Sequence, residues 1–199
     1  MTTATGTAYE VRALGPDTWD AFAALAERHN GVWGGCWCLA FHPRDPAPDQ
    51  ALEPMERARC RKRQLVLTGR AHAALVMDGD VAVGWCQYGS PEELPRITHR
   101  SQVEALQERP PDYRITCFFV DRHHRRGGFA VTALRGALDL IARAGGGLVE
   151  AYPYDTAGER ASSSFLWSGT RAMFEQAGFA YVAPKGKRHC IVRRTVAPA

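Results

Sequence analysis

Ile-Thr-Cys-Phe-Phe-Val-Asp at 115–121, followed by Arg-Arg-Gly-Gly-Phe-Ala at 125–130, is the stretch of this sequence that decides the fold. Its first part belongs to an apolar run that predicts a central strand over 113–120. Its second part is a basic glycine turn, and the periodic apolar residues after the turn predict a helix over 131–144. A strand expected at 148–152 returns parallel to the first strand through this helical crossover. The unit is therefore strand, glycine turn, helix and parallel strand.

The glycine turn is suited to binding a diphosphate. Glycines allow successive N–H groups to point inward, and the helix N-terminus adds the positive end of its dipole. Arg125 and Arg126 add full positive charges beside it. The sequence contains no G-x-x-x-x-G-K-[ST] motif, and the turn does not fit the G-x-G-x-x-G motif of dinucleotide-binding folds. Arg125, Gly128 and Ala130 instead match the R-x-x-G-x-A pattern of acyl-CoA transferases.

The rest of the chain predicts further short strands with helices between them. Asp78-Gly79-Asp80 is a tight-turn signal that predicts a hairpin. Asp17 is the expected N-cap of the first helix, and Gly31 is its expected end. A polar, proline-bearing segment at 90–112 is expected to be part helix and part loop. The remaining strands are predicted at 8–14, 73–77, 81–88, 179–182 and 189–194, and the remaining helices at 17–30, 50–68 and 170–176.

Residues 113–179 resemble the core of the GNAT superfamily of N-acetyltransferases. A third block carries the resemblance with the two above: Arg-Ala-Met-Phe-Glu-Gln-Ala-Gly-Phe at 171–179 is similar to the family's terminal helix and the Gly-Phe that leads into a strand. The resemblance implies one α/β domain over 1–199, with a disordered start at 1–6. It also implies a mixed, mostly antiparallel sheet flanked by helices, in which a splayed pair of parallel strands holds acetyl-CoA.

The resemblance assigns the coenzyme site residue by residue. Main-chain groups around Phe118 and Val120 would bind the pantetheine arm, and one N–H there would polarise the acetyl carbonyl. Many family members place a tyrosine in the terminal helix to protonate the departing thiolate, and Phe174 stands at that position without a proton to give. The expected coenzyme-binding residues are Phe118, Val120, Arg125, Arg126, Gly127, Gly128, Phe129, Ala130 and Phe174.

Glu150 and Tyr152 are the candidate catalytic residues. A carboxylate inside a strand is uncommon, and Glu150 lies in the strand that should border the split, so it is the candidate general base. Period-two alternation places Tyr152 on the same face. Tyr152 is the candidate acid, and Tyr154 is a candidate wall of the acceptor site. The alternatives are that Glu150 is exposed at the rim or pairs with a core arginine, and that both tyrosines simply pack.

The segment around Cys36-Trp37-Cys38 fits neither the helix nor the strand period. In the GNAT family the first helices and their connection commonly wall the acceptor site, so Trp33 and Trp37 are candidate acceptor-binding residues that stack on a flat or cationic group. The alternatives are a buried packing of aromatics and thiols, or a zinc site. A C-x-C pair without a second pair is weak evidence for zinc, so no metal is expected.

The composition of the chain indicates a globular domain without a membrane span or a nucleic-acid site. Hydrophobic residues make up 45% and charged residues 23%, which is ordinary for a globular domain. No run approaches the roughly 18 apolar residues of a membrane span, and the N-terminus lacks the features of a signal peptide, so a cytoplasmic protein with free thiols is expected. The net charge is +4. The only cluster of basic residues, over 57–63, is expected to be a solvated helix face rather than a nucleic-acid site.

The expected function is transfer of an acetyl group from acetyl-CoA to the primary amine of a small molecule, by direct attack in a ternary complex. Two alternatives stay open: acetylation of a protein lysine or N-terminus, and a non-catalytic acyl-CoA-binding module. A zinc or redox protein built on Cys36 and Cys38 is the remaining candidate. The sequence does not indicate which amine is the acceptor, how long the acyl chain is, or whether the chain forms a homodimer.

Overall fold

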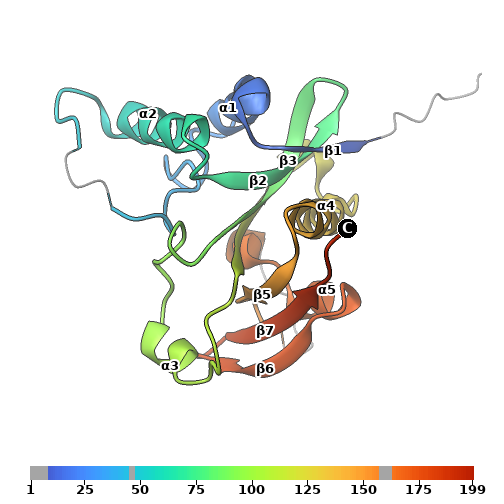
Figure 1. Cartoon of the computed structure of the whole chain (residues 1–199). Coiled ribbons are helices and arrows are strands. Elements are labelled where there is room, and N and C mark those ends of the chain that lie inside the picture. Colours follow the sequence, from blue (N-terminus) through green and yellow to red (C-terminus); the bar gives the residue numbers. More distant parts are fainter. Residues whose placement is uncertain (1–8, 45–47, 157–162) are drawn as a thin grey trace, which may run out of the picture.

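The computed structural model describes residues 9–44, 48–156 and 163–199 (Figure 1). The expected disorder at 1–6 lies outside the described residues. The helices found in the described part of the chain are all too short or too polar to cross a membrane.

The strands form one mixed sheet of seven strands in the order β1-β2-β3-β4-β5-β7-β6. Every neighbouring pair is antiparallel except β4 and β5, which run parallel. This confirms the predicted mixed, mostly antiparallel sheet with one parallel pair. The strands are β1 (Glu10–Ala13), β2 (His72–Asp78), β3 (Val81–Gly89), β4 (Tyr113–Val120), β5 (Gly147–Ala151), β6 (Ala180–Lys185) and β7 (His189–Val196).

Helices cover both faces of the sheet, and each face has its own core. Figure 1 shows α1 and α2 on one side of β2 and β3, with α4 on the other. Alternation along β2 sends Leu75 and Met77 into the core under α1 and α2, and Ala74 and Val76 into the core under α4. The α-helices are α1 (Trp19–Glu27), α2 (Pro54–Leu67), α3 (Arg100–Glu104), α4 (Phe129–Arg143) and α5 (Arg171–Gln176), and short 3₁₀ turns are η1 (Pro16–Thr18), η2 (Arg122–His124) and η3 (Ser163–Ser168).

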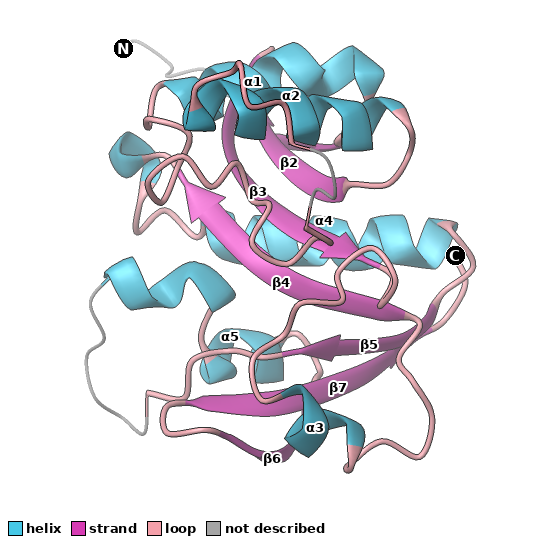
Figure 2. Ribbon diagram, turned by 90° about the vertical axis from the view of Figure 1, so that its left-hand side faces the viewer, coloured by secondary structure: helices cyan, strands magenta, loops and turns pink. Residues whose placement is uncertain are grey.

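The parallel pair separates soon after it forms. Residues 113–115 of β4 pair with 149–151 of β5, whereas β4 itself continues to Val120. Gln87 lies opposite Cys117 and Tyr88 opposite Ile115, so Thr116 is the extra residue of a β-bulge. Figure 2 shows β4 diverging from β5 beyond this point. The divergence leaves one edge of β4 unpaired over 116–120.

Three predicted helix boundaries were wrong. Asp17 is not an N-cap, because it lies inside η1, and α1 begins at Trp19 after Thr18, whose side chain makes no capping hydrogen bond. The first helix ends at Glu27, and the chain after it forms turns to Gly31 and beyond. The second helix begins at Pro54 rather than at residue 50, because proline tolerates the first helical position, where no N–H partner is needed.

Candidate active site

A cavity of about 840 Å³ lies over the unpaired edge of β4 and the start of α4. Among the residues predicted to bind the coenzyme, Gly127 and Phe174 alone do not line it. Its cationic and titratable lining residues are Arg122, His124, Arg125 and Arg126, and no carboxylate of the described residues lines it. The cavity is therefore positive at the end formed by the glycine turn.

The glycine turn exposes a row of main-chain donors. Gly128 is the N-cap of α4 and has φ +79°, and Arg126 has φ +67°, so both lie in the left-handed region. Within the described residues, the N–H groups of 126–130 have no intramolecular acceptor. A Cβ on Gly127 would meet the Phe129 ring at 2.5 Å, which explains that glycine. Free N–H groups at a helix N-terminus form an anion site.

The unpaired edge of β4 offers a second set of main-chain groups. The Asp121 N–H donates to the Val83 carbonyl at 2.8 Å, toward β3. Because the backbone groups of successive residues point to opposite edges of a strand, Val120 and Phe118 direct their N–H and C=O groups to the open edge. An amide-containing ligand lying along this edge can pair with them as an additional strand does.

Phe174 lies behind the cavity rather than in it. Its side chain is fully buried and packs edge-on against Phe118, with ring centroids 5.9 Å apart, and against Phe179 at 4.9 Å. Phe118 itself lines the cavity. Phe174 therefore supports a cavity residue and has no exposed ring edge of its own.

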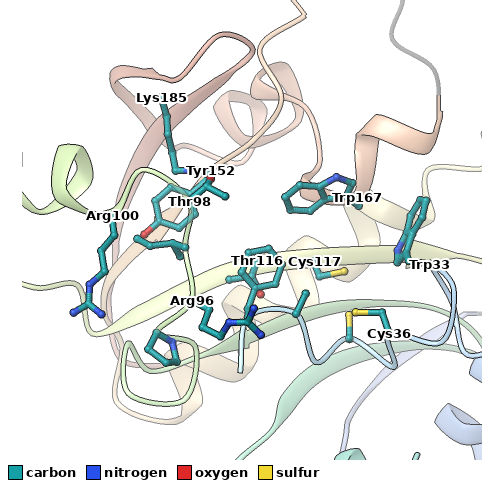
Figure 3. A pocket seen from close by; sticks show the side chains of 15 residues that line it. Trp33, Cys36, Arg96, Thr98, Arg100, Thr116, Cys117, Tyr152, Trp167 and Lys185 are labelled. Atoms are coloured by element: carbon teal, nitrogen blue, oxygen red, sulfur yellow. Dashed lines mark hydrogen bonds between the residues drawn. The ribbon is translucent and has the colours of Figure 1, made fainter. Parts of the chain in front are cut away.

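A second cavity of about 760 Å³ adjoins the first, and Trp33 and Trp167 line both (Figure 3). Two tryptophans shared as walls mean that ligands in the two cavities would meet there. The other residues that line the second cavity are Cys36, Cys38, Ala40, Phe41, Pro95, Arg96, Ile97, Thr98, Arg100, Thr116, Cys117, Tyr152 and Lys185.

The structure separates the residues predicted to bind the acceptor. Trp33 is 43% exposed and lines the second cavity, whereas Trp37 is 1% exposed and packs against Trp19 and Phe22 in the core under α1. Trp33 and Trp37 both take left-handed backbone conformations, which fit no regular helix or strand period. Tyr154 is buried, accepts a hydrogen bond from Arg188 at 2.8 Å and does not line the cavity.

Glu150 is fully buried and does not line either cavity. Its Oε1 accepts from the Tyr152 hydroxyl at 2.5 Å and from Gln107 at 3.0 Å, and its Oε2 accepts from Arg193 at 2.8 Å. This arrangement matches the alternative of an arginine partner. The Tyr152 ring does line the second cavity, but burial and the adjacent Glu150 raise the pKa of its hydroxyl. Tyr152 therefore keeps its hydroxyl proton and donates it in a hydrogen bond to Glu150.

Sequence reasoning missed a buried lysine beneath the second cavity. Lys62 was expected on a solvated helix face, but it is 0% exposed. Its Nζ donates to Gln87 Oε1 at 2.9 Å, and Gln87 donates to Thr116 Oγ1 at 3.1 Å on the cavity floor. Burial lowers the pKa of Lys62, and burial together with the Lys62 charge lowers that of His42 to about 2. The spacing of three from Lys62 to buried Leu65 was the available signal.

Three cysteines, Cys36, Cys38 and Cys117, line the second cavity near Lys62. Trp85 Nε1 donates to Cys38 Sγ at 3.3 Å. Burial would raise the pKa of Cys38, but a hydrogen bond with Cys117 and the nearby Lys62 charge lower it overall. The cysteines are free, and the described residues contain no cluster of three or more His, Cys, Asp or Glu side chains placed to hold a metal ion. His123, in η2, is exposed, and His124 is half-buried against Phe129.

No family model and no curated protein matches this sequence. Solved structures do. A GNAT-family acetyltransferase from Desulfovibrio desulfuricans is 18% identical with a TM-score of 0.53, and the match covers 96% of this chain and all of that one. A protein from Corynebacterium glutamicum, described as histone acetyltransferase HPA2 and related acetyltransferase, is 14% identical with a TM-score of 0.53, and the match covers 96% of this chain and 97% of that one. A ribosomal-protein-S5-alanine acetyltransferase from Vibrio fischeri is 14% identical with a TM-score of 0.51, covering 94% and 93%.

These likenesses extend over nearly the whole of each chain at low identity, so they speak to architecture. They agree with the mixed sheet and its single parallel pair. The chain has the fold of the GNAT-family acetyltransferases.

Proposed function

We propose that this chain transfers an acetyl group from acetyl-CoA to the primary amine of a small molecule. The observation that carries the proposal is the pair of adjoining cavities that share Trp33 and Trp167. One cavity ends at an anion-binding turn, and the other, at about 760 Å³, has the size of a small-molecule site. Adjoining cavities allow both substrates to be bound at once, so the amine attacks the thioester directly in a ternary complex.

The residues of the first cavity fit the two ends of acetyl-CoA. Main-chain N–H groups of 126–130 and the Arg125 and Arg126 side chains would hold the pyrophosphate. The open edge of β4 at Phe118 and Val120 would pair with the amides of pantetheine. A main-chain N–H of that edge would also stabilise the negative charge that develops on the acetyl oxygen. Bound there, acetyl-CoA supplies an activated acyl group.

The chemistry on the acceptor side needs a neutral amine. Its nitrogen attacks the acetyl carbon, the C–N bond forms as the C–S bond breaks, and the amine proton passes to solvent. Glu150 is poorly placed to take that proton, because both of its oxygens already accept hydrogen bonds from Tyr152, Gln107 and Arg193. Coenzyme A would leave as a thiolate, since Phe174 has no proton to donate.

Coenzyme binding is tested with Gly128→Val and a matched control, Gly69→Val. Both glycines have positive φ, +79° and +65°, and a Cβ on either meets nothing within 4 Å, so the backbone strain is similar. Only a side chain on Gly128 would occupy the turn over α4. We expect calorimetry with coenzyme A to show loss of affinity in Gly128→Val and unchanged affinity in Gly69→Val. Equal affinities in the two variants would refute the pyrophosphate assignment.

Acetyl transfer is tested separately by the release of free thiol from acetyl-CoA in the presence of a panel of small amines. Amine-dependent thiol release supports the transferase. Tight binding of acetyl-CoA without thiol release toward any amine, peptide lysine or peptide N-terminus would favour a non-catalytic acyl-CoA-binding module instead.

A further inference from the structure

The second cavity, which under the proposed function is the acceptor site, has an unbalanced charge. Arg96, Arg100 and Lys185 line it, and no aspartate or glutamate of the described residues does. Figure 3 shows Arg100 and Lys185 at the end away from Trp33, on the same side as Tyr152, with Arg96 between the two ends. Because Trp33 borders the coenzyme cavity, the positive end lies away from the reacting thioester.

Two of the cations have no anionic partner in the described part of the chain. Arg96 makes no side-chain hydrogen bond or ion pair there; only its main chain is fixed, through an N–H bond to Phe41 at 3.1 Å. The ammonium of Lys185 is nearly buried, donates to Thr98 Oγ1 at 2.6 Å, and has no carboxylate within ion-pair distance. Arg100 differs, because Glu104 already pairs with it at 2.6 Å.

Arg96 is exposed, but Lys185 is 5% exposed, and removing its charge from water without an ion-paired carboxylate costs free energy. Burial lowers the pKa of Lys185, and the charge of Glu150 opposes this shift only in part. An anionic group entering between Arg96 and Lys185 would offset the cost and form charge-assisted hydrogen bonds. An ammonium group in the same place would be repelled, so the cavity disfavours polycationic amines.

The rest of the lining is apolar and aromatic. The rings of Phe41 and Trp167 lie 5.6 Å apart between centroids, and Ile97 and Trp33 add further apolar surface. This lining suits a flat or apolar body between the anionic group and the amine. The cations would repel an ammonium group placed beside them, so the amine of a bound acceptor is expected at the opposite end of the cavity, at Trp33.

We propose that the acceptor is a primary amine that carries an anionic group at the opposite end of an apolar body, as 4-(aminomethyl)benzoate does. The carboxylate binds at Arg96 and Lys185, the apolar body lies against Phe41 and Trp167, and the amine faces the coenzyme cavity at Trp33. This assignment rests on the proposed function for the amine, while the anion site itself rests only on the cavity.

The anion site is tested by binding alone, with 3-phenylpropionate and its uncharged amide, 3-phenylpropanamide, as probes in calorimetry. We expect the acid to bind at least about tenfold more tightly than the amide, and Arg96→Gln to remove that preference. Arg143→Gln is the matched control, since Arg143 is exposed at the end of α4 and the charge change is the same. Equal affinity for acid and amide, failure of the acid to bind, or an unchanged preference in Arg96→Gln overturns the proposal.

The amine assignment is tested with 4-(aminomethyl)benzoate and benzylamine as acceptors in the thiol-release assay. We expect kcat/KM to be at least about tenfold higher for 4-(aminomethyl)benzoate, and Arg96→Gln to reduce that ratio toward one. Turnover of benzylamine at the same efficiency overturns the assignment. If the protein prefers the acid in calorimetry but neither binds acetyl-CoA nor releases thiol, the proposed function is refuted and the anion site is supported.

Discussion

Acidification should destabilise this fold through His42. This side chain is 1% exposed, and burial, followed by the neighbouring Lys62 charge, lowers its pKa to about 2. In the unfolded chain the pKa of histidine is about 6.5. Below that pH the unfolded state binds a proton that the folded state does not, so stability is complete above pH 6.5 and is lost as the pH falls. From pH 6.5 to 5.0 the loss is about 2 kcal/mol, at about 1.4 kcal/mol for each unit.

The assay is denaturant unfolding at pH 7.5, 6.5 and 5.0 for the wild-type chain, His42→Asn and His123→Gln. We expect the free energy of unfolding of His42→Asn to fall less between pH 7.5 and 5.0 than that of the wild type, by about 2 kcal/mol. His123 is exposed, so His123→Gln should follow the wild type. Other groups with lowered pKa values, such as the half-buried His189, titrate in all three proteins and cancel in the comparison. Equal losses in wild type and His42→Asn would refute the reasoning.

Two substitutions test the residues at which the sequence placed catalysis. Glu150→Ala should lower the free energy of unfolding, measured by denaturant unfolding, by about 3 kcal/mol, because it leaves the Arg193 guanidinium and the Tyr152 hydroxyl without their acceptor. A Glu150→Gln variant that keeps its stability but loses turnover would show instead that Glu150 is the general base. Phe174→Tyr should lower the free energy of unfolding by about 1–3 kcal/mol, because its hydroxyl would be buried between Phe118 and Phe179 without a partner. The kcat of this variant should equal that of the wild type, and a rise in kcat would show that the hydroxyl reaches the departing thiolate.

The βαβ unit was predictable because its signals are local. The apolar run of β4 was placed at 113–120, where the structure has it, and the Asp78-Gly79-Asp80 turn was placed between β2 and β3. Strand periods and turn residues need no knowledge of the tertiary structure. Helix ends were less predictable: α1 begins after Thr18 although Asp17 had the better local signal, and α2 begins at Pro54 rather than at residue 50.

The first cavity, which is proposed to hold the coenzyme, was easier to foresee than the second for the same reason. Its glycine turn is a single continuous segment, 125–130, and the free N–H groups there depend on the backbone conformation rather than on particular side chains. The second cavity is assembled from separate segments, at 33–41, 95–100, 116–117 and 185 among others. No period in the sequence brings these segments together, and the divergence of β4 from β5 decides which of them face the gap.

Lys62 shows why counting charge was a poor guide to this molecule. The run over 57–63 has the composition of a solvated helix face, but burial of one member is decided by its position on the apolar stripe with Leu65. Once buried, Lys62 has no carboxylate partner within the described residues, and it contacts Gln87, which donates to Thr116 on the floor of the second cavity. Neither the floor nor the far end of that cavity carries a carboxylate among the described residues. This lining agrees with the proposed acceptor, because an anionic substituent would meet cationic groups and no like charge there.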